Sequence, residues 1–174
     1  MHRIQSIDTQ LSQMFRGFDE IAHSLQLQGM GTLRKISRDD LPIAGIYFIE
    51  VWAGRKSTLQ DWLTEFQAAF DREEFKQWFV PSCQKGRIRR HEVLQEWMPL
   101  YLGKAKKIGK RLWEHLYLEK QHRTFALKLQ ARELLAPYRY RLSVLPLEVR
   151  NYDVIAPRLE AALRRKHLPL VGRQ

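Results

Sequence analysis

Hydrophobic residues recur at helical spacing near the start of the chain. Over residues 4–27 they fall at steps of three and four, with polar residues on the opposite face, which predicts an amphipathic helix. Gly29 and Gly31 are expected to end that helix. Helices of this kind most often pack on their own domain. The near-heptad repeat also fits pairing with a partner helix, so both interpretations stay open.

Three segments have the character of β-strands. Residues 41–52 are rich in β-branched and aromatic residues, with apolar side chains on both faces, and therefore predict a central strand. Residues 100–102 predict a short strand, after which Gly103 permits a turn. Residues 138–146 begin with polar alternation and predict a third strand, which Pro146 ends or places at a sheet edge.

Helices are predicted after the second and third of these strands. One begins at about residue 108 and carries apolar residues at steps of four. Residues 124–135 predict another helix, closed by Pro137. Residues 152–167 predict the last helix, in which Pro157 is tolerated only in the first turn.

The segment between the first two strands, residues 53–98, is predicted to be an inserted helical unit. Residues 57–60 resemble a capping box at the start of one helix, and a second short helix is expected after Asp71. Pro81 is expected to end this pair of helices.

The whole pattern predicts one α/β (α+β) domain over residues 1–174. It combines a small, mainly antiparallel three-stranded sheet flanked by helices with an N-terminal helical extension over residues 1–40 and the insertion over residues 53–98. A composition of 44% hydrophobic and 28% charged residues supports a folded domain and excludes a disordered chain.

The charge balance indicates a polyanionic partner. Thirty Lys and Arg residues against 19 Asp and Glu give a net charge of +11, which favours nucleic acid first and an anionic membrane surface second. Residues 85–91 concentrate four cations around one glycine, namely Lys85, Arg87, Arg89 and Arg90. This segment is either a solvated loop or a contact to phosphates or guanine edges.

The single cysteine, Cys83, excludes an intramolecular disulfide and a cysteine-rich zinc site, and fits a reducing compartment. No apolar run has membrane-spanning length, and the first residues lack the apolar segment of a secretory signal. A cytoplasmic protein without a membrane partner is therefore expected.

One stretch has the character of a phosphate-binding site. The strand at residues 100–102 leads into the helix that carries Arg111 and His115, which lie beside the buried stripe and face the rim of the core. A guanidinium held there is well suited to phosphate oxygens because its planar fork can donate two hydrogen bonds.

Further residues extend this stretch into a known pattern. The tripeptides Gly-Ile-Tyr and Tyr-Leu-Gly occur at residues 45–47 and 101–103, and a Glu-x-x-Leu motif at residue 160 is followed by a proline nine residues later. The positions that carry the pattern are Tyr47, Tyr101, Lys104, Arg111, His115 and Glu160. This ordered set resembles the GIY-YIG nuclease family, and within it the restriction-endonuclease branch.

The resemblance implies a metal-dependent endonuclease that hydrolyses DNA phosphodiester bonds. Glu160 would hold a single Mg²⁺ (or Mn²⁺), Arg111 would bind the scissile phosphate, and Tyr47 would act as general base or position the water. Lys104 would favour the tyrosine phenolate. Tyr101 and His115 would complete the hydrogen-bond network, with His115 able to carry a proton.

The chain departs from the family pattern in two places. The tripeptides usually lie close together, whereas 53 residues separate Tyr47 from Tyr101 here, and Gly172 stands where the family commonly has asparagine. The resemblance still implies a site-specific restriction or defence enzyme that acts as a homodimer. Two alternatives remain: an inactive DNA-binding module of the same fold, and a nuclease directed at RNA or single strands. The residues expected to contact nucleic acid are Lys85, Arg87, Arg89, Arg90, Lys106, Lys107 and Lys110.

Overall fold

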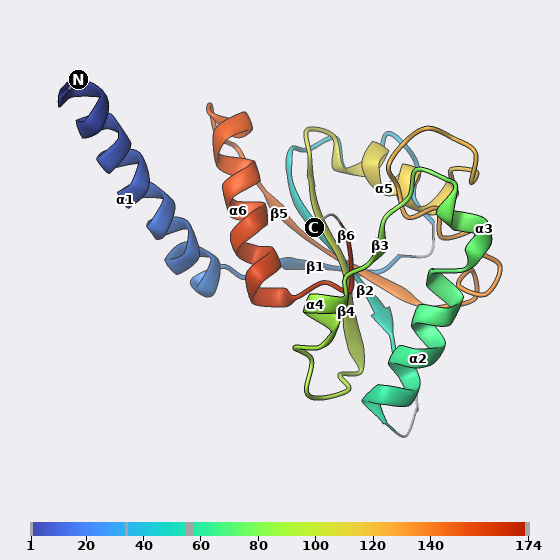
Figure 1. The fold of residues 1–174 in the computed structure, drawn as a ribbon. Coiled ribbons are helices and arrows are strands. Elements are labelled where there is room, and N and C mark those ends of the chain that lie inside the picture. The colour runs from blue at the N-terminus through green and yellow to red at the C-terminus, as the bar shows by residue number, and fades with distance from the viewer. Residues whose placement is uncertain (1, 34, 55–57, 173–174) are drawn as a thin grey trace.

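A four-stranded antiparallel sheet forms the centre of the computed structural model, which describes residues 2–33, 35–54 and 58–172 (Figure 1). The strands are β1 (Gln28–Thr32), β2 (Gly45–Trp52), β3 (Ser82–Cys83), β4 (Trp97–Ala105), β5 (Tyr140–Pro146) and β6 (Val171–Gly172). The central sheet has the order β1-β5-β2-β4, and β3 pairs with β6 in a separate small sheet. The predicted α+β class is confirmed.

Helices cover both faces of the central sheet. They are α1 (His2–Ser24), α2 (Leu59–Phe70), α3 (Glu73–Lys76), α4 (Lys85–Ile88), α5 (Ile108–Tyr117) and α6 (Tyr152–His167). In Figure 1, α1 and α6 lie to the left of the sheet and α2, α3 and α5 to its right. Across the described ranges, no helix combines the length and the apolar character that crossing a bilayer requires.

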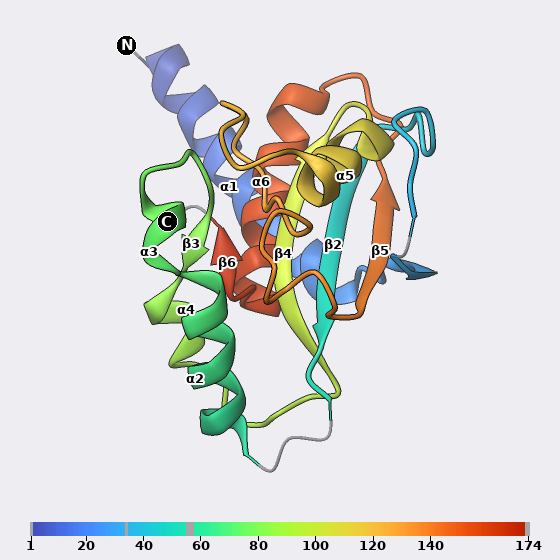
Figure 2. The same ribbon diagram turned by 90° about the vertical axis from the view of Figure 1, so that its right-hand side faces the viewer.

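Strand β2 is the interior strand that the sequence predicted. It pairs with β4 on one side and β5 on the other, as Figure 2 shows, and its residues are buried up to Val51. Its side chains alternate between two cores. Tyr47 and Ile49 pack in the core that includes α5 and α2, whereas Ile46 and Phe48 pack in the core beneath α6.

The central sheet has one strand more than expected. Helix α1 ends at Ser24, and Gly29 and Gly31 lie within β1, which pairs with β5. Strand β5 is therefore an interior strand. An edge position was one of the two alternatives that Pro146 suggested, and it is not the one observed. All five residues of β1 are exposed, so it lacks the apolar alternation by which strands are recognised in a sequence.

The helix predicted over residues 124–135 is wrong, because this segment forms irregular turns. Two buried cations hold its backbone. Lys128 has a positive φ of 55° and donates to two backbone carbonyls, and Arg132 donates to the carbonyls of Leu127 and Phe70. These tertiary bonds override the local helical spacing.

Two smaller expectations need correction. Gly103 lies within β4, opposite Tyr47 of β2, and does not form a turn. Pro157 is the sixth residue of α6, beyond its first turn. The predicted bounds of α6 and the predicted start of α5 are confirmed.

The insertion packs into the main core. Trp62, Phe66 and Phe70 of α2 join the core that contains Tyr47, and β3 pairs with the C-terminal strand β6. Of the predicted capping box, Ser57 lies outside the described residues. Thr58 caps α2, because its side chain accepts the backbone N–H of Asp61 at 3.1 Å.

Candidate active site

A cavity of about 360 Å³ brings together side chains from four elements. Five of the residues expected to be catalytic line it: Tyr47 of β2, Tyr101 and Lys104 of β4, Arg111 of α5 and Glu160 of α6. Because β4 is the outer strand of the central sheet, the cavity reaches both faces at this edge. Tyr47, Tyr101 and Arg111 come from the α5 side, and Lys104 and Glu160 from the α6 side.

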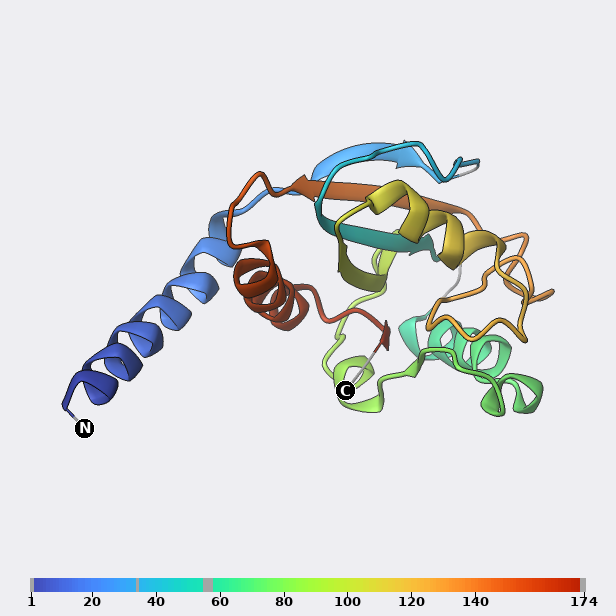
Figure 3. The same cartoon turned by 90° about the horizontal axis from the view of Figure 1, so that it is seen from above.

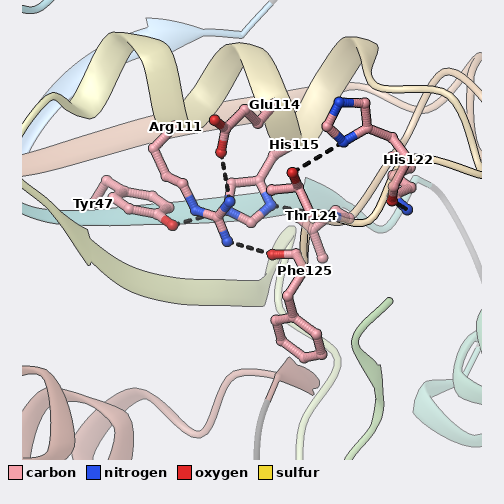
Figure 4. Close-up of polar contacts among 9 residues, drawn as sticks. Tyr47, Arg111, Glu114, His115, His122, Thr124 and Phe125 are labelled. Carbon is pink, nitrogen blue, oxygen red and sulfur yellow. Dashed lines mark hydrogen bonds and ion pairs between the residues drawn. The ribbon is translucent and has the colours of Figure 1, made fainter. Parts of the chain in front are cut away.

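His115 lies behind this cavity and is completely buried. Its Nε2 is 2.8 Å from the Tyr47 hydroxyl (Figure 4). Its ring also contacts the Tyr101 ring in a tilted arrangement, with a centroid distance of 4.7 Å. The backbone N–H of Leu127 donates to Nδ1 at 3.0 Å. Histidine and tyrosine are thus fixed relative to each other by α5, β2 and the irregular segment after α5.

These bonds define the protonation of His115. Burial, together with the positive charge of Arg111, lowers its pKa well below the usual 6.5, so the ring is neutral at neutral pH. A backbone N–H can only donate, so Nδ1 is the acceptor and the ring proton is on Nε2. His115 therefore donates to the Tyr47 oxygen. This geometry favours a fixed hydrogen-bond donor over the expected proton carrier.

Arg111 is the cation beside the tyrosine hydroxyls. Burial raises the pKa of Tyr47 well above 10.0, nearby Tyr101 raises it further, and the charge and hydrogen bond of Arg111 lower it. The pKa of Tyr101 is also raised by burial and lowered by Arg111. The sequence assigned this favourable charge to Lys104. The side chain of Lys104 instead projects from the other face of β4, toward Glu160.

Arg111 is itself held in place by two further contacts. It donates to the Glu114 carboxylate at 2.6 Å and to the carbonyl of Phe125, as Figure 4 shows. Burial alone would lower the pKa of Arg111, but the neighbouring tyrosines and Glu114 raise it. The guanidinium is therefore a permanent charge at a fixed position in the cavity wall.

Gly103 allows the tyrosines to lie this close to the strand. A Cβ at this position would be 2.5 Å from the Tyr47 hydroxyl oxygen and 2.8 Å from a ring carbon of Tyr101. Any side chain would push Tyr47 out of place. The glycine of the Tyr-Leu-Gly tripeptide is thus explained by sterics in this chain, because it leaves room for Tyr47 of the neighbouring strand β2.

The acidic side of the cavity is formed by Glu160. Its carboxylate is 3.6 Å from Lys104 Nζ, and the side chain is 14% exposed. One hard oxygen ligand with space for water fits Mg²⁺, which commonly keeps several waters and takes only one or two carboxylates. The described residues contain no group of three or more His, Cys, Asp or Glu side chains arranged for a metal. Among the described residues that line the cavity, Glu160 is the one carboxylate, so it would be the metal ligand there.

The residues expected to contact nucleic acid divide into two sets. Lys85, Arg89, Arg90, Lys106, Lys107 and Lys110 have exposed side chains, and Lys106 pairs with Asp153 at 2.9 Å. Arg87 is half-buried and donates to the carbonyl of Pro169 at 3.0 Å. Arg87 is thus held against the segment that leads into β6.

The sequence analysis missed Arg164, Phe125 and Pro157 in the cavity wall. Arg164 lies one turn after Glu160 on α6, and this spacing could have placed both side chains on one face of the helix. Phe125 belongs to the irregular segment and could not have been placed by pattern. A scan of family models, a search of curated proteins and a search of solved structures each found no match to this chain.

Proposed function

We propose that the protein is a Mg²⁺-dependent endonuclease that hydrolyses DNA phosphodiester bonds at defined sites. One observation carries this proposal. Residues that lie up to 113 positions apart in the sequence, from Tyr47 to Glu160, line one cavity together with Tyr101, Lys104 and Arg111. They are the residue types that phosphodiester hydrolysis requires: a base, phosphate-binding cations and a carboxylate for a metal.

Tyr47 is suited to act as the general base. Its oxygen accepts the N–H of His115 and faces the positive charge of Arg111, and both interactions favour the phenolate. A water between the phenolate and a bound phosphate could give its proton to Tyr47 as it attacks the phosphorus atom. Arg111, fixed by Glu114, would meanwhile hold the phosphate oxygens.

A divalent metal on Glu160 would supply charge neutralisation at the phosphate and at the leaving oxygen. Lys104 now neutralises that carboxylate from 3.6 Å, so its ammonium would share the site with the metal or turn toward the phosphate. The protein's own part is to present one carboxylate, Glu160, together with the cations Lys104 and Arg111 in a single cavity.

Cleavage of both DNA strands would favour a homodimer with two active sites, and α1 offers a surface for a second copy of the chain. Its apolar residues form a regular heptad pattern, namely Ile4, Ile7, Leu11, Met14, Phe18 and Ile21. Phe18 packs toward α6, whereas Ile4, Ile7, Leu11 and Met14 are exposed. Figure 3 shows the first half of α1 extending away from the sheet.

The charges beside this stripe favour a parallel pair of α1 helices. In the heptad numbering that places Ile4 at position a, Arg3 is at g and Asp8 at the following e. Parallel coiled coils bring g of one helix against the next e of the other, so each Arg3 would meet the Asp8 of the second copy. We therefore expect a homodimer, with α1 along the twofold axis.

The activity test offers supercoiled plasmid, single-stranded DNA and RNA to the full-length protein with Mg²⁺, Mn²⁺ or EDTA. The proposal expects metal-dependent linearisation of plasmid at a small number of positions, found by sequencing the new ends. Preferential loss of RNA or single strands would select the alternative nuclease. Binding to duplex without cleavage under either metal would select an inactive DNA-binding module.

A further inference from the structure

Arg164 is a cavity residue without an assigned role in the proposed chemistry. It lies on α6, four residues after Glu160, and borders the same cavity as Tyr101 and Arg111. Among the described residues that line this cavity, Glu160 is the one acid and Lys104, Arg111 and Arg164 are the cations. The cavity thus has more positive charge than the single metal-binding carboxylate can neutralise.

A second arginine reaches the same place from the insertion. The guanidinium of Arg87, on α4, lies against Gly172 of β6, which also borders the cavity. A Cβ on Gly172 would be 3.5 and 3.7 Å from the two terminal nitrogens of Arg87 and 3.9 Å from a ring carbon of Tyr101. Arg87 therefore occupies the space into which a side chain at position 172 would project.

The backbone explains why position 172 lacks a side chain. Its φ of +149° lies in a region that L-residues rarely adopt, so glycine is needed there. The chain consequently cannot place an asparagine at this point. The polar group next to Tyr101 comes instead from Arg87, which is oriented by its bond to Pro169.

Arg87 and Arg164 act on each other as like charges. Arg87 lies beside Gly172, and Gly172 and Arg164 border the same cavity, so two like charges flank one rim. Burial and the charge of Arg164 accordingly lower the pKa of Arg87. Two cations brought together at a cavity rim repel each other, and an anion bound between them would relieve that repulsion. Phosphate suits the pair best, because each guanidinium can donate two parallel hydrogen bonds to its oxygens.

We propose that Arg87 and Arg164 form a second phosphate-binding site, which holds the DNA phosphate adjacent to the one that is cleaved. The site rests on the proposed nuclease function and adds a substrate contact to it. It joins the insertion to the active site: α4 supplies one arginine and α6 the other.

Binding of a fluorescent 20-bp DNA duplex tests this site without requiring cleavage. Affinity is measured by polarisation at several salt concentrations, with Ca²⁺ in place of Mg²⁺. Arg164→Met and Arg87→Met keep the apolar stem and remove the charge. The matched controls are Arg165→Met, at an exposed arginine paired with Asp19, and Arg72→Met, at a partly exposed arginine paired with Glu74. Thermal melting confirms that each variant is folded.

We expect each site variant to bind about tenfold more weakly, with the slope of log affinity against log salt reduced by about 0.9, the value of one phosphate contact. The controls should stay within about twofold of wild type. Slopes equal to wild type in both site variants would overturn the site. If Arg87→Met does not fold, the salt slope of Arg164→Met alone determines whether the phosphate site is supported.

The outcomes separate this inference from the proposed function. Reduced slopes in a protein that does not cut plasmid with any metal would support the phosphate site and refute the nuclease. Metal-dependent cleavage by wild type, together with unaltered slopes in both variants, would refute the phosphate site alone. A wild-type protein that does not bind the duplex would refute both.

Discussion

The Nε2–H of His115 donates to the hydroxyl oxygen of Tyr47 across 2.8 Å, while Nδ1 of the same ring accepts the backbone N–H of Leu127. This pair determines how Tyr47 can be used. The histidine has no free lone pair for the tyrosine proton, so it stabilises the phenolate by donation and does not remove its proton.

Substitutions of His115 distinguish these roles. His115→Gln keeps an N–H group at the distance of Nε2, whereas His115→Ala removes it. We expect the single-turnover cleavage rate to fall by about 100-fold in the alanine variant, because the preorganised hydrogen-bond donor is lost. The rate of the glutamine variant should fall by only about tenfold, because its donor is kept but displaced. Equal loss in both variants would indicate a proton carrier and contradict the fixed-donor role.

Gly103→Ala should abolish the proposed DNA cleavage, because it displaces Tyr47. The added methyl group would lie 2.5 Å from the Tyr47 oxygen, so the ring must move, and a displacement of about 1 Å costs about 100-fold in rate. The free energy of unfolding should fall by about 1–3 kcal/mol, as in other overpacked cores. Gly17→Ala on α1, where no atom lies within 4 Å of the added methyl group, is the matched control and should keep full activity.

Glu160→Gln should remove metal dependence together with cleavage. The amide is close in shape to the carboxylate but carries no charge for the metal. We expect binding of Mn²⁺, followed by electron paramagnetic resonance in the presence of DNA, to weaken at least about tenfold. Glu148→Gln, at an exposed position before α6, is the control. Unchanged Mn²⁺ binding in Glu160→Gln would place the metal elsewhere.

Charged substitutions on α1 test whether this helix forms the proposed dimer surface. Leu11→Glu, in the exposed half of the apolar stripe, should convert a dimer to a monomer in sedimentation analysis, whereas Gln13→Glu on the polar face should not. Arg3→Glu should weaken the dimer, and the double variant with Asp8→Arg should restore it if the pair is parallel. A wild-type monomer at micromolar concentration would refute this surface.

Most of the fold could be predicted because its signals are local. Helix α6 and strand β2 carry strong periodicity and composition, and both are placed correctly. Strand β1 could not be predicted, because its exposed, glycine-rich residues give no alternation. The segment over residues 124–135 has helical spacing, but Lys128 donates to the carbonyl of Lys120 in the preceding turns and Arg132 donates to the distant carbonyl of Phe70.

Part of the candidate site could likewise be predicted from the sequence, and part could not. The resemblance to the family pattern indicated Tyr47, Tyr101, Arg111 and Glu160, and these four residues line one cavity. It could not indicate that Arg111, and not Lys104, supplies the charge beside Tyr47. The face of β4 from which Lys104 projects follows from the continuation of the strand through Gly103. A turn had been expected at Gly103, so the direction of Lys104 could not be predicted.

The pH dependence of cleavage follows from the pKa of Tyr47. Burial and the nearby Tyr101 raise that pKa well above 10.0, although Arg111 opposes them, so the phenolate is the minor form at neutral pH. Its fraction rises about tenfold per pH unit until the pKa is reached. The logarithm of the cleavage rate should therefore rise with pH with a slope of about one, between about pH 7 and pH 9.

The most direct test is the single-turnover rate of DNA cleavage by Tyr47→Phe across this pH range, compared with wild type and with Tyr117→Phe, which removes a hydroxyl from the same helix as His115. We predict that Tyr47→Phe binds DNA normally, cleaves about 1000-fold more slowly and loses the rise with pH, while Tyr117→Phe follows wild type. A Tyr47→Phe rate within about threefold of wild type, with the same pH profile, would contradict the assignment of Tyr47 as the base.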